Sequence, residues 1–307
     1  MRIVRSTRDI DAAPGRCCIA IGFFDGVHLG HQQVIKQTIA DARQHEALAL
    51  VITFDRHPNT VVAPNRVPPL IYSLPQKLRA IEAAGTDCLL LIHFDETFSR
   101  QTGEAFVRSL ARDLNPVQSL SVGANFVFGH KRSGNVALLK TLGQELGFTV
   151  HGLAAVSLDG KAVSSTRIRE AIARGDLDAA SQLLGRSYSI AGTVIRGDQV
   201  GHKLGFPTAN LDLSGLALPP RGVYAAHAEF AKKSHRAVVN IGIRPTLNEP
   251  NPQIRVEAHL LDFQGDLYGQ ELELTFVDKL RDEQKFASLS DLQAQITRDV
   301  QSANSRF

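Results

Sequence analysis

Two histidines near the start of the chain form the first pattern that could do chemistry. His28 and His31 stand in the segment Gly-Phe-Phe-Asp-Gly-Val-His-Leu-Gly-His, residues 22–31, directly after an apolar run. Residues three apart on a helical turn lie on one face, and a helix start offers free N–H groups and a positive dipole end. Two imidazoles in this place suit the phosphates of a nucleotide. Two other interpretations of this segment stay open: a glycine turn with two surface histidines, and half of a metal site.

Two other polar segments in the first half could also hold phosphate. Residues 164–166 read Ser-Ser-Thr, which are natural N-cap residues, and Arg169 follows shortly after them. Hydroxyls, exposed N–H groups and a guanidinium can all bind phosphate oxygens, although an ordinary N-cap has the same sequence. Asn125 follows another apolar run, and Phe126 and Phe128 beside it could stack on a flat ring or belong to the core.

A glycine-rich segment in the second half stands beside two neutral oxygen ligands. Residues 197–210 read Gly-Asp-Gln-Val-Gly-His-Lys-Leu-Gly-Phe-Pro-Thr-Ala-Asn, which is not a Walker A sequence. Its glycines could form a flexible flap over phosphates. Thr208 and Asn210 point to the same side of an extended segment, and such oxygens suit Mg²⁺. A hairpin loop rich in turn residues is the alternative interpretation.

A carboxylate in the second half could act as a base. Glu257 stands in the strand-like run Val-Glu-Ala-His-Leu-Leu-Asp-Phe, residues 256–263. An alcohol that attacks the γ-phosphate of ATP benefits from a positioned carboxylate. Without further context, a solvated surface carboxylate is the simpler interpretation of Glu257.

Composition limits the classes of protein to which the chain can belong. Its 307 residues suggest two domains, and 34 basic against 31 acidic residues are too balanced for a nucleic-acid or membrane surface. Three cysteines in apolar runs, two of them adjacent, make no disulfide framework. The charged N-terminal segment lacks an apolar signal region, and no run approaches the roughly 20 apolar residues of a membrane span. We therefore expect a cytoplasmic protein with reduced thiols and small-molecule partners, and neither nucleic acid nor membrane.

The elements that position these residues follow from the periodicity of the first half. Apolar, strand-like runs cover residues 17–24, 47–54, 87–94, 119–126 and 148–156, and helical spacing covers 31–45, 103–114 and 135–146. This alternation predicts an α/β domain with a parallel sheet and helices on both faces. Ligands of such sheets bind outside the carboxyl ends of the strands, and the polar segments of the first half lie there.

The second half has a different pattern. A helical segment at 166–184 closes the first half, with Gly185 as a plausible C-cap. Short strand-like runs then follow at 187–196, 222–230, 236–243, 254–263 and 271–277, without helices between them. This pattern predicts an antiparallel barrel, and apolar residues from Leu289 to Val300 predict a terminal amphipathic helix. We place the domain boundary near residue 185, which gives domains 1–185 and 186–307.

The segments of the first half together resemble a known family. His28-Leu-Gly-His31 matches the His-x-Gly-His motif that marks the nucleotidylyltransferase superfamily. More narrowly, residues 22–31, 53–58 and 164–169 are similar to the FMN adenylyltransferase half of prokaryotic bifunctional riboflavin kinase/FAD synthetases. The resemblance implies a Rossmann-like domain in which the two histidines stabilise the phosphates of ATP during transfer. The nucleotide-binding residues that we predict here are Gly22, Phe23, Asp25, Gly30, Asn125, Ser164, Ser165, Thr166 and Arg169, and the flavin-binding residues are Pro58 and Phe128.

The second half resembles riboflavin kinase. The resemblance rests on the segment up to Pro207-Thr-Ala-Asn210, on residues 240–246 and 256–263, and on Leu-Arg-Asp-Glu-Gln-Lys-Phe at 280–286. It implies a six-stranded barrel in which Pro-Thr-Ala-Asn binds Mg-ATP and Glu257 is the catalytic base. The nucleotide-binding residues that we predict in this half are Gly201, Lys203, Gly205, Pro207, Thr208 and Asn210, and the metal ligands are Thr208 and Asn210.

The two halves together imply two successive reactions with ATP as co-substrate. Riboflavin would be phosphorylated to FMN with Mg²⁺, and FMN would then be adenylylated to FAD. An FMN phosphate is already largely dianionic at pH 7, so it needs charge neutralisation rather than a base. The first alternative is a nucleotidylyltransferase for another phosphorylated acceptor, with a non-catalytic flavin- or nucleotide-binding barrel. The second alternative is a binding regulator without turnover. The sequence does not fix the oligomeric state.

Overall fold

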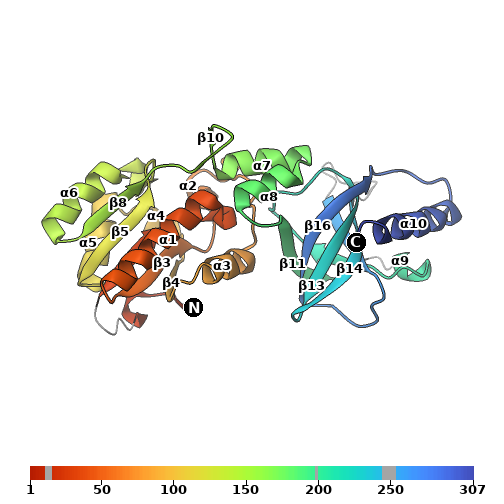
Figure 1. Cartoon of the computed structure of the whole chain (residues 1–307), viewed down its shortest axis with the longest axis horizontal. Helices are drawn as coiled ribbons and strands as arrows, with labels where there is room; N and C mark the ends of the chain where they lie inside the picture. Colours follow the sequence, from red (N-terminus) through yellow and green to blue (C-terminus); the bar gives the residue numbers. More distant parts are fainter. Residues whose placement is uncertain (11–15, 198–199, 244–253) are drawn as a thin grey trace. The chain divides into compact units, whose positions relative to one another are not determined.

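The computed structural model describes residues 1–10, 16–197, 200–243 and 254–307, without the side chains of residues 200 and 203. By its packing the chain divides into two compact units (Figure 1). The first unit joins Met1–Leu70 to Leu74–Ser165, and the second joins Ile71–Ser73 to Thr166–Phe307. Within the described residues, no helix is both long enough and apolar enough to cross a lipid bilayer.

A six-stranded parallel sheet forms the centre of the first unit. In spatial order its strands are β1 (Arg2–Val4), β4 (Cys88–Ile92), β3 (Leu48–Phe54), β2 (Cys17–Ile21), β5 (Val117–Gly123) and β8 (Thr149–Leu153). Every pairing between neighbouring strands is parallel. This sheet confirms the predicted α/β architecture. The edge strand β1 was not predicted, because three residues carry no periodic signal.

Helices cover both faces of this sheet, as predicted. Figure 1 shows them: α1 (Leu29–Gln44), α3 (Leu74–Ala83), α5 (Gly103–Asp113) and α6 (Val136–Leu146). Along β2, Cys17 and Ile19 pack into the apolar cluster that contains Phe106 of α5 and Leu139 of α6. Cys18 and Ala20, at the alternate positions, pack into the cluster formed with α1 and α3. Burial on both faces explains why β2 reads as a continuous apolar run.

The order of the strands reverses at β2 and so creates the place where a ligand can bind. Strands β3 and β4 lie on one side of β2, and β5 and β8 lie on the other. The loops after β2 and β5 therefore border a crevice at the carboxyl ends of the strands, the usual ligand position in such sheets. Short elements complete the unit: η1 (Thr7–Asp9), η2 (Asp25–Val27), α2 (Asn59–Val62), η3 (Pro64–Arg66), α4 (Glu96–Ser99), β6 (Val127–Phe128), η4 (His130–Arg132), β7 (Gly134–Asn135), β9 (Ser157–Leu158) and β10 (Lys161–Ala162).

A closed antiparallel barrel forms the centre of the second unit. Around the ring its strands are β11 (Ser189–Ile195), β12 (Ala209–Asp212), β15 (Ile254–Leu260), β14 (Lys233–Ile243), β13 (Gly222–Phe230) and β16 (Glu271–Arg281). The pairing of β16 with β11 closes the ring. The six strands confirm the predicted barrel. The run of four residues that forms β12 was not predicted as a strand, because its Asn and Asp residues are uncommon in strands.

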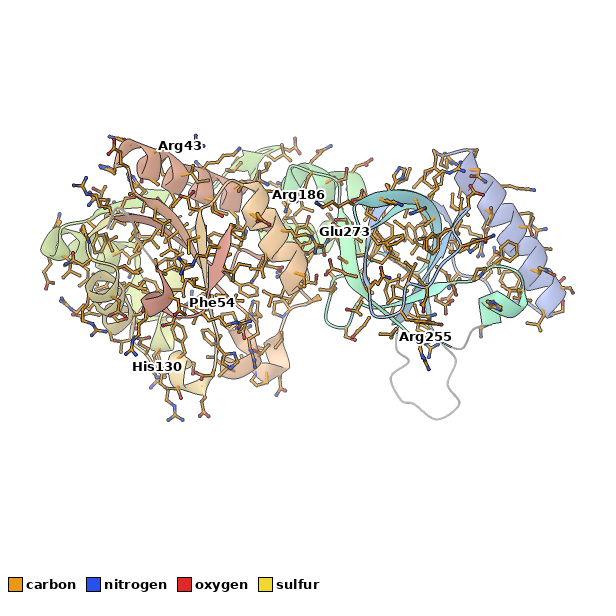
Figure 2. All side chains as sticks on the ribbon, turned by 90° about the horizontal axis from the view of Figure 1, so that it is seen from below. Arg43, Phe54, His130, Arg186, Arg255 and Glu273 are labelled. Atoms are coloured by element: carbon orange, nitrogen blue, oxygen red, sulfur yellow. The ribbon has the colours of Figure 1, made fainter. Side chains whose placement is uncertain are left out.

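Large side chains fill the barrel, and a helix packs on its outside. Tyr188 and Tyr224 are both almost fully buried, and Figure 2 shows the density of side chains within this unit. Helix α10 (Leu289–Asn304), which confirms the predicted terminal helix, buries Ala303 against the barrel. Arg281 of β16 donates two hydrogen bonds, of 2.8 and 2.7 Å, to the carboxylate of Asp299, which attaches α10 to the barrel wall.

The helical segment predicted at 166–184 is two helices, so the prediction of one segment was wrong in this respect. Helix α7 (Ser165–Arg174) ends before Gly175, whose φ of 79° is left-handed. Asp176 then caps α8 (Leu177–Leu184), and Gly185 ends it in the left-handed conformation, as predicted. The packing of the chain changes units between Ser165 and Thr166. Our division of the two functions near residue 185 stays a prediction.

Candidate functional site

A strained loop connects β2 to α1 and carries the histidine pair. Phe24 and Val27 have left-handed φ values of 55° and 41°, a conformation that side chains adopt only where the surroundings enforce it. His28 then caps α1, and its Nδ1 accepts a hydrogen bond of 3.3 Å from the backbone N–H of His31. The two rings are stacked, with centroids 3.6 Å apart. The loop therefore presents both imidazoles together at the N-terminus of a helix of 16 residues.

A cavity of about 350 Å³ opens over this loop. Its lining includes five of the predicted nucleotide-binding or catalytic residues from the loop and one from the end of β5, namely Gly22, Phe23, His28, Gly30, His31 and Asn125. A Cβ atom at Gly30 would lie 3.2 Å from the ring of His28, so glycine leaves room beside the imidazole. The cavity brings together a helix N-terminus, two imidazoles and an amide. This set of groups suits phosphate oxygens.

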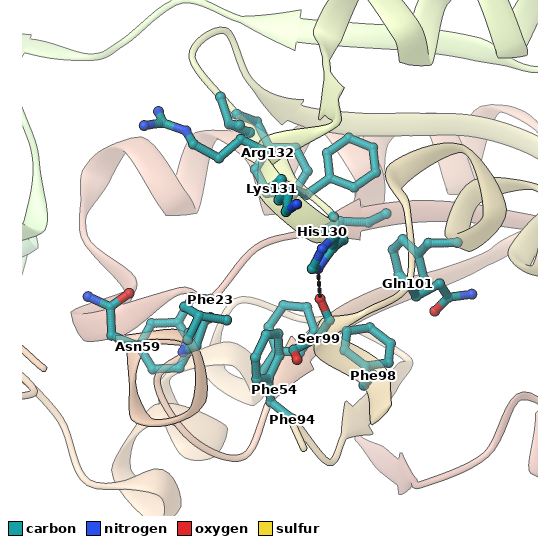
Figure 3. Close-up of a pocket in the computed structure, with 18 residues that line it drawn as sticks. Phe23, Phe54, Asn59, Phe94, Phe98, Ser99, Gln101, His130, Lys131 and Arg132 are labelled. Atoms are coloured by element: carbon teal, nitrogen blue, oxygen red, sulfur yellow. Dashed lines mark hydrogen bonds between the residues drawn. The ribbon is translucent and has the colours of Figure 1, made fainter. Parts of the chain in front are cut away.

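A larger, aromatic cavity of about 800 Å³ adjoins the first one. Figure 3 shows rings from separate elements gathered around one space, together with the basic turn η4. Its lining includes Phe23, Phe54, Pro58, Phe94, Phe98, Phe106, Phe126, Phe128, His130, Lys131 and Arg132. The rings of Phe126 and Phe128 stack with centroids 5.1 Å apart. Such a space suits a flat, largely apolar ring system with a few polar groups at its edge.

Phe23 and Phe126, together with Ile21, line both cavities. A ligand in the aromatic cavity and a nucleotide beside His28 and His31 would therefore meet at these shared side chains. Reactants held in contact in this way react far faster than in free solution. The arrangement of the two cavities would suit a transfer between two bound molecules.

The remaining predicted residues of this half have different positions. Asp25 is buried, and within the described part of the chain it is not among the residues that line either cavity. Its carbonyl oxygen accepts a hydrogen bond of 3.2 Å from the hydroxyl of Ser165. Ser164 and Ser165 are the last two residues of the first unit, whereas Thr166 and Arg169 belong to the second unit. The nucleotide-binding role of these residues stays a prediction.

A buried lysine that contacts this loop was not predicted. Lys77 of α3 is only 3% exposed, and its ammonium donates hydrogen bonds to the carbonyl oxygens of Phe23 (3.2 Å) and Phe54 (2.7 Å). Burial lowers the pKa of Lys77 to about 8, against the opposing attraction of Asp25 and Asp55. The sequence did contain a signal, because Lys77 falls in the same helical stripe as apolar residues of α3.

In the barrel, three polar residues lie side by side across neighbouring strands. Asn210 of β12 is directly opposite Glu257 of β15, which is directly opposite Asn240 of β14. Residues paired in this way share one face of the sheet. Val256 and Ala258, which flank Glu257, are buried in the barrel, so the three polar side chains share the outer face. Glu257 is itself half-buried.

The glycine-rich segment packs closely onto the predicted metal ligands. A Cβ atom at Gly197 would lie 2.3 Å from the side chain of Asn210, and one at Gly201 would lie 3.2 Å from Oγ1 of Thr208. Gly205 has a φ of 83°, which favours glycine. The side chain of Lys203 and the backbone of residues 198–199 lie outside the described part of the structure.

A third cavity, of about 410 Å³, lies beside these residues. Pro207, Thr208 and His202 line it, together with Phe263 and Tyr268 from the loop after β15. Asn210 and Glu257 are not among its lining residues within the described part of the chain. The cavity brings two of the predicted kinase residues to one concave surface.

His259 holds the proline of this segment and was not predicted. Its Nδ1 donates a hydrogen bond of 2.8 Å to the carbonyl oxygen of Pro207, and its ring packs edge-on against Phe206. His259 lies two residues after Glu257 on β15, so both side chains are on the same face of the strand. In the described residues no cluster of three or more His, Cys, Asp or Glu side chains could hold a metal ion. A histidine-based metal centre, one alternative for His28 and His31, therefore has no third ligand of these types there.

Comparison with known proteins finds relatives of both halves of the chain. The model of the FAD synthetase family matches residues 10–167, and that of the riboflavin kinase family matches residues 184–307. Proteins described as bifunctional riboflavin kinase/FMN adenylyltransferase from Haemophilus influenzae and Escherichia coli K12 are 37% and 36% identical to this chain. Both matches span 100% of the chain, and they cover 99% and 98% of the respective relatives.

A solved structure shows a similar fold. It is described as a macrolide-efflux protein from Streptococcus pneumoniae, and it is 27% identical with a TM-score of 0.81. The match covers 98% of each chain. The two family models and the relatives show that the chain belongs to the family of bifunctional riboflavin kinase/FMN adenylyltransferases.

Proposed function

We propose that this chain phosphorylates riboflavin to FMN in its barrel unit and adenylylates FMN to FAD in its first unit. The observation that carries this proposal is the pair of adjoining cavities, where an aromatic space meets the histidine-lined space at Phe23. A flat flavin fits the aromatic space, and a nucleotide fits the other. The matching family models support both activities.

Adenylyl transfer requires charge neutralisation more than proton transfer. The FMN phosphate is largely dianionic at pH 7, and one of its oxygens attacks the α-phosphorus of ATP while pyrophosphate leaves. His28, His31 and the N-terminus of α1 face the cavity in which that negative charge develops. Donors fixed before the reaction stabilise such charge without further reorganisation. Asn125, which lines the same cavity, is proposed to hold phosphate oxygens as well.

Phosphorylation of riboflavin requires a base, and Glu257 is proposed to supply it. The 5′-hydroxyl of riboflavin loses its proton to the carboxylate as its oxygen attacks the γ-phosphorus of ATP, and ADP leaves as the bond between the γ-phosphorus and the bridging oxygen breaks. Asn210, which lies directly beside Glu257, and Thr208 would hold Mg²⁺. Their neutral oxygens fit an ion that takes few protein ligands and binds substrate phosphates. When bound, Mg²⁺ supplies positive charge to the transferring phosphoryl group.

The alternative with a different phosphorylated acceptor is less well supported. The aromatic cavity of about 800 Å³ is larger and more apolar than a small polar acceptor requires. The division of activities at residue 185, the assigned site residues and the use of Mg²⁺ are part of our proposal. The cytoplasmic location and the exclusion of nucleic acid and membrane as partners stay predictions.

A single time course tests the proposal. The purified chain is incubated with riboflavin, ATP and Mg²⁺, and the flavins are separated by chromatography. We expect FMN to rise and then to decline as FAD forms. If FMN accumulates and added FMN also gives no FAD, the proposal for the first unit is wrong. If the folded protein converts no flavin at all, the whole proposal is wrong.

A further inference from the structure

One buried ammonium group donates hydrogen bonds to the backbone at the ends of two neighbouring strands, β2 and β3. Lys77 lies on α3, and its Nζ donates 3.2 Å to the carbonyl oxygen of Phe23 and 2.7 Å to that of Phe54. Phe23 follows the end of β2, and Phe54 is the last residue of β3. Both phenylalanines line the aromatic cavity. The ammonium therefore links two residues that line the proposed acceptor site.

The same ammonium also contacts the ring of Phe23. Nζ lies 4.2 Å from the ring centroid, within the range of a cation–π contact. The ring of Phe23 also packs edge-on against His57, with centroids 4.9 Å apart. The Phe23 carbonyl oxygen also accepts a hydrogen bond of 3.0 Å from the hydroxyl of Thr53. The backbone of Phe23 is therefore fixed by hydrogen bonds, and its ring is fixed by packing contacts. Lys77 contributes to both sets of contacts.

The position of Phe23 matters because its side chain lines the aromatic cavity and the nucleotide cavity. The residue after it, Phe24, has a left-handed φ of 55°. A strained backbone of this kind persists only where neighbouring contacts determine it fully. Loss of the ammonium would leave the Phe23 and Phe54 carbonyl oxygens with fewer donors. The loop would then be free to shift where the acceptor meets the nucleotide.

A purely structural role would not require a charge at this position. The stem of Lys77 packs in the apolar stripe of α3, and a methionine could fill that space. A buried ammonium costs solvation free energy unless partners compensate for it. The carboxylates that face it are Asp25 in the loop and Asp55 after β3. The groups that compensate for the buried charge of Lys77 thus belong to the loop after β2 and to the end of β3, which also supply residues that line the aromatic cavity.

We propose that Lys77 is a positioning residue for adenylyl transfer, whose ammonium fixes the backbone of Phe23 and Phe54 so that the acceptor and nucleotide cavities meet. This inference rests on the function proposed above for the first unit. Lys77 does not act on the reacting atoms. It sets the position of the wall between the two bound substrates.

The test compares Lys77→Met, which keeps the stem and removes the ammonium, with Lys77→Arg, which keeps a charge. We expect kcat/KM for FMN in FAD formation to fall roughly 10- to 100-fold in Lys77→Met, since misplacement by about 1 Å can cost 100-fold. Lys77→Arg should recover part of this loss. FMN formation from riboflavin, measured in the same preparation, should stay unchanged. Lys140→Met, on the exposed surface of α6, is the matched control and should change neither rate.

The pH dependence separates the role of the charge from that of packing. Lys77 is charged below its pKa of about 8 and neutral above it. Wild-type kcat/KM for FMN should therefore decline as the pH rises through about 8. Lys77→Arg, which stays charged, should retain its rate to higher pH. The other titratable groups near Lys77 are Asp25, Asp55 and His57. They are the same in wild type and in Lys77→Arg, so a difference between the two pH profiles reports on residue 77.

Each outcome decides the inference. Equal kcat/KM values for wild type and Lys77→Met refute it, as does a wild-type pH profile that Lys77→Arg does not change. If Lys77→Met fails to fold, the pH profiles of kcat/KM for wild type and Lys77→Arg still test the inference. If the wild-type protein forms no FAD, the proposed function fails instead, and the two failures are thus distinguishable.

Discussion

Replacing Glu257 by glutamine would remove a base from the barrel while it leaves the shape of the site unchanged. Glutamine has nearly the size of glutamate, so the pairing of this position with Asn210 and Asn240 is retained. The buried neighbours Val256 and Ala258 keep the strand in register. The change therefore affects the carboxylate alone.

The expected loss follows from the role of a general base. Such a group contributes about 10²- to 10⁴-fold to the rate, which corresponds to about 3–5 kcal/mol in the activation free energy. The rate of FMN formation from riboflavin should fall by that factor. The rate of FAD formation from added FMN should stay within about twofold of wild type, because the site that we propose for FAD formation belongs to the other unit and needs no carboxylate base.

The assay follows both conversions separately by chromatography, with riboflavin or FMN as the starting flavin. Glu229→Gln is the matched control, because Glu229 is an exposed residue of β13 on the same barrel. It should change neither rate. A normal rate of FMN formation in Glu257→Gln would refute the role of the carboxylate. An equal loss of both conversions would refute the assignment of one reaction to each unit.

Three further outcomes are expected. A His28→Ala, His31→Ala double variant should accumulate FMN and lower the rate of FAD formation by about 10²- to 10³-fold, as for the loss of charge-stabilising donors; wild-type FAD formation in this variant would contradict the site. Gly197→Ala should raise the KM for ATP in FMN formation, because its Cβ would lie 2.3 Å from the side chain of Asn210; unchanged kinetics would show that the segment moves away without cost. Removal of divalent cations with EDTA should stop FMN formation, and Mg²⁺ should restore it; a rate that is insensitive to EDTA would exclude the proposed metal.

The sequence predicted the architecture well where burial produces a simple pattern. Strands β2, β3 and β4 read as apolar runs because both faces of the parallel sheet are covered there. Periodicity failed where elements are short or interrupted. Strand β1 has three residues, β12 has four, and a glycine at position 175 divides one expected helix into two.

The histidine cavity could be predicted because its residues follow the ends of neighbouring strands. His28 and His31 come after β2, and Asn125 comes after β5, so the topology brings them together. The aromatic cavity could be predicted only in small part. Rings such as Phe94 and Phe106 are buried and have the sequence appearance of ordinary core residues.

Contacts that depend on tertiary structure could not be predicted from local patterns. Lys77 meets the backbone of Phe23 across 54 positions of sequence, and His259 meets Pro207 across 52. Neither contact joins residues of one helix turn or of one strand, so neither follows from the periodicity of a single element. Only the apolar stripe around Lys77 indicated that this lysine is buried.

The wall shared by the two cavities of the first unit also bears on inhibitor design. Because Phe23 borders both spaces, a compound that joins a flat tricyclic ring to a nucleotide through a short linker can fill both at once. Binding of one end then gives the other end a high effective concentration at its own space. FAD is itself such a bivalent compound, so the enzyme's product has the chemical form from which a selective inhibitor would be built.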